Sequence, residues 1–368
     1  MRLCFLSWSW VNGLHDARLR RQLTNKLKIF VCGLALFAKL ALAEDLVPNH
    51  TPSIKPEDVA VVINDQDKNS LEVGDYYLNA RNIPRKNLIT VSIPTKITEL
   101  SEKQFTPIRE KILDNLSPNI QVIVLLWTTP YAVKCNSITS AISLGYEPKF
   151  CEKNCATGNK NPYFNSASHQ PNQDYNMRLS ILLPTDSVDL AKSIIDKGVL
   201  SAFKANEATA YFLNTKDKNR SKPRERFYPS DLTKIESKKL ILRTINADFI
   251  QDKKDVMFYF TGAKFVPFLE TINFMPGAIA DHLTSRGGIL YNTSQMSSLK
   301  WLEAGATGSY GSVSEPCNFW QKFPNPEVLL NHYLAGETLI EAYWKSVYWP
   351  AQGLFIGEPL AAPYQNNN

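Results

Sequence analysis

Residues 59–93 read VAVVINDQDKNSLEVGDYYLNARNIPRKNLITVSI, and this stretch decides the fold. Its first five residues are apolar and mostly β-branched, which is typical of a buried parallel strand. A helix capped by Ser70 is predicted next and runs to about Asn82, because Pro84 disfavours its continuation. A second strand follows over 88–93. Two strands joined by a helix through short loops form a βαβ unit, which predicts a parallel sheet.

Strands and helices continue to alternate along the rest of the chain. Further strands are predicted at 120–126, 179–183, 208–213, 239–244, 256–261 and 305–313. Helices are predicted at 101–116, 187–205, 297–303 and, as one or two helices, 327–348. Segment 216–226 is predicted to be a charged loop and 277–288 a turn with a short helix. This order predicts an α/β fold of three layers with a mainly parallel sheet.

The predicted domain covers residues 57–364 and contains a long polar insertion at about 134–175. A linker over 44–56 precedes the domain, and a disordered tail over 365–368 follows it. The hydrophobic residues make up 44% of the chain, which is ordinary for a globular protein and excludes an intrinsically disordered chain.

The first 43 residues have the features of an export signal. In TNKLKIFVCGLALFAKLALA (24–43), two lysines precede an apolar run, and Ala41-Leu42-Ala43 fits a cleavage site. We predict a signal peptide over 1–43, a natural start near residue 26, and an exported protein that is periplasmic or secreted. An uncleaved membrane anchor is the alternative. No second apolar stretch of 18 residues follows, so we expect no membrane span after the leader is removed.

The net charge of +6 belongs to this leader. Residues 1–43 contain seven Lys or Arg and one acidic residue, which leaves 34 basic and 34 acidic residues over 44–368. A balanced chain offers no overall attraction for phosphate backbones, so nucleic acid is excluded as a predicted partner.

Four cysteines lie outside the leader: Cys135, Cys151, Cys155 and Cys317. An even number in an exported protein predicts disulfides. Cys151 and Cys155 are close enough in sequence for a local bridge, and Cys135 and Cys317 both follow predicted strands and could form another. A structural zinc site is the alternative for the insertion, with His169 as the nearby histidine.

Ligands of parallel sheets bind beyond the carboxyl ends of the strands. Residues at such positions include Asp65, Asp67, Thr128, Thr129, Thr261, Gly262, Ser314, Glu315 and Cys317. Asp281 and His282, between two glycine-containing turns, could reach the same edge. We therefore expect Asp65 and His282 to lie close together, either as a structural hydrogen bond or as part of a substrate or metal site.

These residues suggest three kinds of chemistry. His282 could act as a general base oriented by Asp281, or it could only fix its loop. Cys317 could be a nucleophile, unless a disulfide removes its thiol. Asp65, Asp67, Asp281, His282 and Glu315 offer ligands for a divalent cation, although no compact metal motif is present. Nucleotide-binding motifs and the GxSxG serine-hydrolase motif are absent as well, so neither a nucleotide site nor a serine-hydrolase site is predicted, and a weakly indicated divalent cation is the one cofactor that the sequence suggests.

Aromatic residues are frequent in the C-terminal third. They include Phe319, Trp320, Phe323, Tyr333, Tyr343, Trp344, Tyr348 and Trp349. Most are expected in the core or at the rim of a groove, where exposed rings could contact a sugar or a peptide.

Four segments carry a resemblance to a family of exported bacterial proteins that has no established activity. They are VVINDQDKNSLEVGDYYLNARNIPRKNL (61–88), PGAIADHLTSRGG (276–288), EAGATGSYGSVSEPCNFWQKFP (303–324) and GEPLAAP (357–363). More distantly, the strand order and residues 357–360 resemble the gingipain-like cysteine peptidases, which implies a caspase-like domain. Those enzymes place a His-Gly pair after one strand and a catalytic cysteine after the next. Here Thr261-Gly262-Ala263 stands in the first place, and 274–281 contains no cysteine.

Two hypotheses about function follow. The first is a degenerate caspase-like or gingipain-like domain in a non-catalytic binding or surface-assembly protein. The second is a hydrolase of peptide or amide bonds, dependent on a thiol or a metal, with His282 as the base. The substrate and the partner are not indicated by either hypothesis.

Overall fold

The computed structural model describes residues 54–153, 155–201, 207–291 and 293–365. All of them belong to one compact unit, Asn49–Asn368. The predicted signal peptide and almost all of the predicted linker lie outside the described residues. Within the described part, no helix is long and apolar enough to cross a bilayer.

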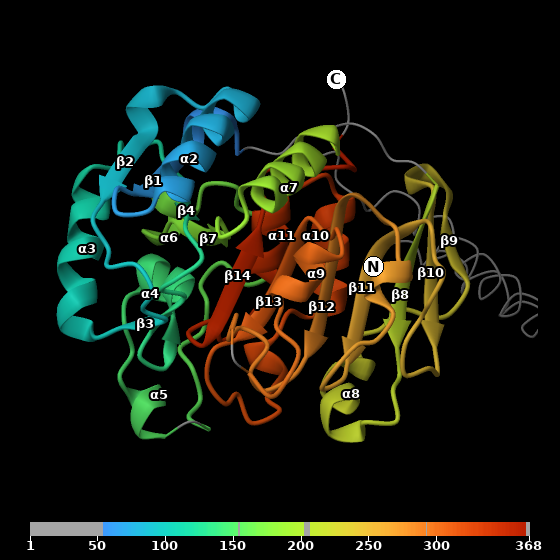
Figure 1. Cartoon of the computed structure of the whole chain (residues 1–368). Helices are drawn as coiled ribbons and strands as arrows, with labels where there is room; N and C mark the ends of the chain where they lie inside the picture. Colours follow the sequence, from blue (N-terminus) through green and yellow to red (C-terminus); the bar gives the residue numbers. More distant parts are fainter. Residues whose placement is uncertain (1–53, 154, 202–206, 292, 366–368) are drawn as a thin grey trace, which may run out of the picture. The chain divides into compact units, whose positions relative to one another are not determined.

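An 11-stranded sheet forms the centre of the molecule, in the order β2-β1-β4-β7-β14-β13-β12-β11-β8-β10-β9 (Figure 1). The first block contains β1 (Val59–Asn64), β2 (Leu88–Val91), β4 (Val122–Leu126) and β7 (Leu179–Leu183), all parallel. The second contains β8 (Ala208–Leu213), β10 (Leu240–Ile245), β11 (Val256–Gly262), β12 (Phe274–Leu283) and β13 (Gly308–Ser312), also parallel.

The last strand of the chain, β14 (Gly353–Gly357), joins the two blocks. It runs antiparallel to β13 and bridges to β7 through Ile356 and Leu182. A short antiparallel strand, β9 (Thr233–Ile235), closes the other end of the sheet beside β10. Three two-residue strands, β3 (Glu99–Leu100), β5 (Ala132–Val133) and β6 (Asn136–Ser137), form a separate small sheet.

Helices cover both faces of the sheet. Their bounds are α2 (Lys68–Arg81), α3 (Glu102–Asp114), α4 (Ile138–Leu144), α5 (Lys149–Glu152), α6 (Pro171–Tyr175), α7 (Val188–Leu200), α8 (Lys218–Glu225), α9 (Leu299–Glu303), α10 (Pro326–Leu334) and α11 (Leu339–Ser346).

Side-chain alternation along β1 shows the three layers. Val59 and Val61 belong to one apolar core with Tyr77 of α2, whereas Ala60 and Val62 belong to a second core with Phe105 of α3. Successive residues of a strand point to opposite faces, so α2 and α3 lie on opposite sides of the sheet. The predicted three-layer, mainly parallel α/β fold is confirmed.

Two segments differ from their predictions. Residues 277–288 were expected to be a turn with a short helix, but residues 277–283 belong to β12. The pairing of β12 with β11 is irregular, because its register shifts between Val256 and Phe258 of β11. The strand absorbs Pro276 and the left-handed Gly277 (φ +84°) at this irregularity. Residues 216–226 were expected to be a loop, but most of them form α8, which is anchored by buried side chains described below.

Candidate functional site

The carboxyl ends of both blocks of strands lie at one edge of the sheet. Tyr291, which follows β12, donates a hydrogen bond to Asp186, which follows β7. Ser314, which follows β13, donates to the carbonyl oxygen of Cys135 in the segment after β4, at 2.7 Å. Segments that follow strands of both blocks therefore meet in space.

A pocket of about 330 Å³ opens at this edge, beyond β1, β4 and β7. Its lining residues are Asp67, Thr95, Lys96, Thr98, Thr129, Asp186 and Tyr291. Two carboxylates, one ammonium and four hydroxyl groups thus meet in a single concave site. Most small-molecule sites are largely apolar with a few polar groups, whereas this lining is almost entirely polar and so favours a polar, charged ligand. We refer to these seven residues as the Asp67 pocket.

Asp67 occupies its position because it begins helix α2. Its carboxylate accepts a hydrogen bond from the backbone N–H of Asn69 at 3.0 Å, so Asp67 is the N-cap of the helix. The predicted cap, Ser70, is wrong: its buried hydroxyl accepts from the N–H of Asn64 at 2.8 Å and donates to the carbonyl of Leu126. The second oxygen of Asp67 accepts from the hydroxyl of Thr185 at 3.3 Å.

Asp186 also lines the pocket and is held by the backbone and by Tyr291. The Thr128 hydroxyl oxygen accepts from the N–H groups of Thr185 and Asp186, both at 2.9 Å, which fixes the turn after β7. Desolvation, followed by the hydrogen bond to the Asp186 carboxylate, raises the pKa of the Tyr291 phenol. Tyr291 therefore stays protonated at neutral pH and donates its proton toward Asp186.

Asp65 does not line the Asp67 pocket. Its exposed carboxylate accepts from the Gln66 side-chain amide at 2.7 Å and from the Ser92 hydroxyl at 2.8 Å, and these bonds lower the pKa of Asp65. Five strand positions separate β1 from β12 in the sheet, about 24 Å at 4.8 Å per strand. The predicted proximity of Asp65 and His282 is therefore wrong.

His282 is buried within β12, and both of its ring nitrogens are engaged. Nδ1 accepts from the indole N–H of Trp301 at 2.9 Å, so the proton of the neutral ring is on Nε2, which donates to the carbonyl of Met296 at 3.0 Å. Burial lowers the pKa of His282 to about 3. A ring in this state has no free nitrogen to act as a general base, which contradicts the catalytic hypothesis for this residue.

Asp281 faces away from His282 and forms a buried ion pair with Arg224 of α8. Arg224 also donates to the carbonyl of Thr261 at 2.7 Å. The pair closes the carboxyl ends of β11 and β12, where the sequence predicted a catalytic site. Asp281 thus does not orient His282, and the predicted pairing of the two side chains is wrong.

The four described cysteines form two disulfides, Cys135–Cys151 and Cys155–Cys317. The prediction of disulfides is confirmed, but the predicted partners, Cys151 with Cys155 and Cys135 with Cys317, are wrong. Cys317 has no thiol in this state, so it cannot serve as the nucleophile. Glu315 accepts from the N–H of Cys317 at 2.9 Å and shapes this loop.

The five predicted metal ligands are not brought together. Asp65 and Asp67 have the partners given above, Asp281 and His282 are buried with others, and Glu315 is engaged in its own loop. In the described chain, a different group, His169, Glu337 and Glu341, has possible ligand atoms within 4.8 Å of one another.

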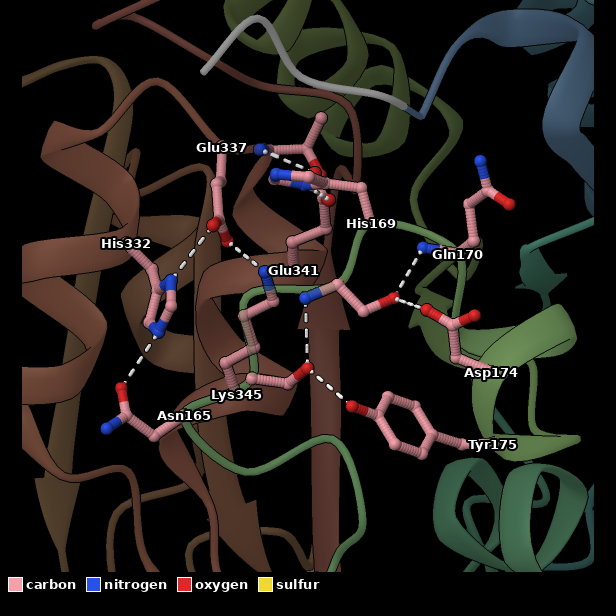
Figure 2. Close-up of polar contacts among 12 residues, drawn as sticks. Asn165, His169, Gln170, Asp174, Tyr175, His332, Glu337, Glu341 and Lys345 are labelled. Atoms are coloured by element: carbon pink, nitrogen blue, oxygen red, sulfur yellow. Dashed lines mark hydrogen bonds and ion pairs between the residues drawn. The ribbon is translucent and has the colours of Figure 1, made fainter. Parts of the chain in front are cut away.

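This group belongs to a buried charged cluster between the insertion and α10–α11 (Figure 2). His169 Nδ1 lies 2.8 Å from Glu341, and His332 Nδ1 lies 2.9 Å from Glu337. The Lys345 ammonium lies 2.8 Å from the other oxygen of Glu337. The hydrogen bond with His332 and the charge of Lys345 hold the pKa of Glu337 below its usual value despite burial.

The donor set of this cluster fits an internal ion-pair network better than a metal ion. A dication bound by Glu337 would lie next to the Lys345 ammonium, and the two positive charges would repel each other. Glu341 also accepts from the backbone N–H of Thr338 at 3.0 Å as part of the capping box of α11. The cluster therefore attaches the insertion to α11.

Sequence reasoning placed Asp67 and Thr129 at the strand ends but missed four residues of the pocket: Thr95, Lys96, Thr98 and Tyr291. It did not place Asp186 among the candidate site residues; Asp186 directly precedes Ser187, the N-cap of α7 that accepts from the N–H of Leu190 at 3.2 Å. The strand-end rule, applied after 179–183 as it was after 59–63, would have found Asp186. Tyr291 carried no comparable signal, because its segment follows a strand that the sequence did not predict.

No protein-family model and no curated protein matches the chain. Two solved structures are similar. One is described as "Structure of Protease", with a TM-score of 0.45 and 12% identity over 87% of this chain and 82% of that one. The other is the Arg-specific cysteine proteinase gingipain R, with a TM-score of 0.44 and 10% identity over 85% of this chain and 80% of that one. At this level of similarity the two matches support no activity for this chain.

Proposed function

We propose that the protein is an exported binding protein that holds a small zwitterionic ligand, such as an amino acid or a short peptide, in the Asp67 pocket without cleaving it. The observation that carries this proposal is the pair of carboxylates, Asp67 and Asp186, that line the pocket. Among the described residues, neither Asp67 nor Asp186 has a cationic partner. A ligand ammonium or guanidinium between them would supply the missing positive charge.

The remaining lining groups suit the rest of such a ligand. Lys96 is exposed at the pocket and has no carboxylate partner in the described part of the chain, so it can receive a ligand carboxylate. The hydroxyls of Thr95, Thr98 and Thr129 can donate to or accept from peptide groups. A volume of about 330 Å³ suits a small ligand better than a folded protein segment.

A binding role without catalysis is supported by the state of the usual catalytic groups. The described cysteines are in disulfides, and the described histidines contact Trp301, Glu341 and Glu337. Export is supported by the predicted signal peptide and by the disulfides, which persist in oxidising compartments.

Calorimetric titration with the tripeptide Gly-Lys-Gly tests the proposal, with N-acetyl-Gly-Gln-Gly-amide, whose blocked termini leave it without charge, as the comparison. We expect Gly-Lys-Gly to bind, and Asp186→Asn to weaken its affinity at least tenfold. Asp189→Asn is the matched control, because Asp189 is exposed in the first turn of α7. Equal affinity of Asp186→Asn and wild type would refute the site. Chromatography of the peptide after incubation should recover it intact, and cleavage products would refute the non-catalytic role.

A further inference from the structure

A second pocket, of about 370 Å³, lies at α8 and the segment after β13. Its lining includes Lys218, Asn219, Lys222, Arg226, Asn318 and Trp320, and no carboxylate. We refer to these residues as the basic pocket. It shares no residue with the Asp67 pocket and has the opposite balance of charge.

Helix α8 presents two different faces. Ser221 and Arg224 are buried against the sheet, where Arg224 pairs with Asp281. Lys218, Lys222 and Arg226 follow one another at intervals of four residues and therefore lie on one side of the helix. Like charges at this spacing repel, so the bare helix carries an unfavourable interaction that a bound anion would relieve.

The cations of this face are only partly neutralised by the protein. Lys218 lies 3.3 Å from Glu225, whereas Lys222 and Arg226 have no carboxylate partner in the described ranges. This local excess of positive charge occurs in a chain whose residues 44–368 are balanced overall. The excess is therefore a property of this pocket and not of the protein as a whole.

Aromatic rings hold the Arg226 guanidinium in place. Its central carbon lies 4.6 Å from the ring centre of Phe227 and 5.4 Å from that of Trp320, and the two rings lie 4.9 Å apart. Cation–π contact positions the guanidinium without using its N–H groups. Those N–H groups stay available for a bidentate contact with an oxyanion, which is the geometry that arginine favours.

We propose that the basic pocket binds an acidic saccharide, a sugar that carries a sulfate, phosphate or carboxylate group. Lys222 and Arg226 would hold the anionic group, and Asn219 and Asn318 would bond to hydroxyls. The flat apolar ring of Trp320 beside the cations suits a sugar ring better than a free inorganic ion. This site is independent of the proposed peptide site, and either one can fail without the other.

Calorimetric titration of the whole protein with a sulfated disaccharide tests the proposal, beside the same disaccharide without sulfate and sodium sulfate alone. We expect only the sulfated disaccharide to bind measurably, with an affinity that falls as the salt concentration rises. Lys222→Gln and Arg226→Gln should each weaken it at least tenfold. Lys103→Gln, an exposed lysine on α3, is the matched control and should leave it unchanged.

Three results would overturn the assignment. Equal binding of the uncharged disaccharide would show that charge does not drive recognition. Equal affinity for sodium sulfate would show that the site recognises an oxyanion and not a saccharide. Unchanged affinity in both α8 variants, with folding verified by circular dichroism, would place the binding elsewhere on the protein.

Discussion

Arg224 of α8 and Asp281 of β12 form an ion pair that is almost completely buried. The same guanidinium donates to the carbonyl of Thr261 at the end of β11 and lies 5.5 Å from the ring centre of Phe260. Helix α8 is thereby fixed over the carboxyl ends of two central strands. The backbone contact is close enough that a Cβ on Gly262 would lie 2.2 Å from the carbonyl oxygen of Arg220. A structural element therefore fills the place where the sequence suggested a catalytic site.

Removing one partner of this pair should destabilise the protein strongly. Asp281→Asn leaves the Arg224 charge buried without a counter-charge, which costs about 3–5 kcal/mol of the free energy of unfolding. Urea unfolding followed by circular dichroism measures the change. The double variant Arg224→Met/Asp281→Leu removes both charges. It should lower the free energy of unfolding by less than the sum of the losses in Arg224→Met and Asp281→Leu alone. A single variant as stable as wild type would contradict the burial of the pair.

The sequence was sufficient to predict the first block of the sheet because its signals are local. The apolar run of β1 and the capping box of α3, with Ser101 and Gln104, need no information from distant residues. β12 was missed because Pro276 and Gly277 are turn residues in isolation. A strand can contain them here because Gly277 donates its N–H to Thr307 and accepts from Tyr333, both distant in sequence.

The site was less predictable because it too depends on contacts between residues that are distant in sequence. The rule about strand ends singled out Asp67, which lines the candidate pocket, but it does not give the lateral order of the strands. Four strands (β4, β7, β14 and β13) lie between β1 and β12, so Asp65 and His282 are separated by half of the sheet's width. The disulfide partners were mispredicted because Cys155 pairs with Cys317, 162 positions along the chain.

The two disulfides should contribute unequally to stability. Cys155–Cys317 closes a loop of 162 positions and Cys135–Cys151 one of 16. In the chain-entropy model these loops correspond to about 5 and about 3 kcal/mol of stabilisation. We therefore expect Cys155→Ser/Cys317→Ser to lower the free energy of unfolding more than Cys135→Ser/Cys151→Ser, as measured by urea titration. The reverse order would show that native contacts outweigh the loop entropy.

Asp67 has two roles, as a carboxylate of the pocket and as the N-cap of α2, and a substitution can separate them. Asparagine is as good an N-cap as aspartate, so Asp67→Asn should keep α2 stable while it removes one pocket carboxylate. We expect a thermal midpoint close to that of wild type and at least tenfold weaker binding of Gly-Lys-Gly. Asp67→Ala should also lose about 1 kcal/mol of stability. If the Asp67→Asn variant binds Gly-Lys-Gly as tightly as wild type does, the Asp67 carboxylate does not contribute to the proposed site.

Divalent metal should have no effect on the buried cluster around Glu337. The Lys345 ammonium already supplies the counter-charge at 2.8 Å, and it also lies 4.9 Å from the ring centre of Tyr163. We expect the thermal midpoint to stay the same when zinc is added or a chelator is present, because a ligand raises it only if it binds the folded state. A rise with zinc that Glu341→Gln abolishes would instead establish a metal site.

His282 gives the protein a predictable acid sensitivity. Its ring is neutral in the folded protein because burial lowers its pKa from 6.5 to about 3. In the unfolded chain the ring binds a proton below about pH 6.5, whereas in the folded protein it does so only near pH 3. The unfolded state thus holds more protons between these values, and acid favours it.

The stability contributed by His282 should therefore be complete above pH 6.5 and fall as the pH is lowered toward 3. The expected slope is about 1.4 kcal/mol for each pH unit, from this residue alone. Because other groups titrate in the same range, the measurement is the difference in free energy of unfolding between wild type and His282→Gln, obtained by urea titration at several pH values. Glutamine keeps an acceptor for Trp301 but has no proton to bind in this range. We expect the advantage of wild type to shrink with acidification, and a difference that stays constant from pH 7 to pH 4 would mean that His282 takes up its proton equally in both states.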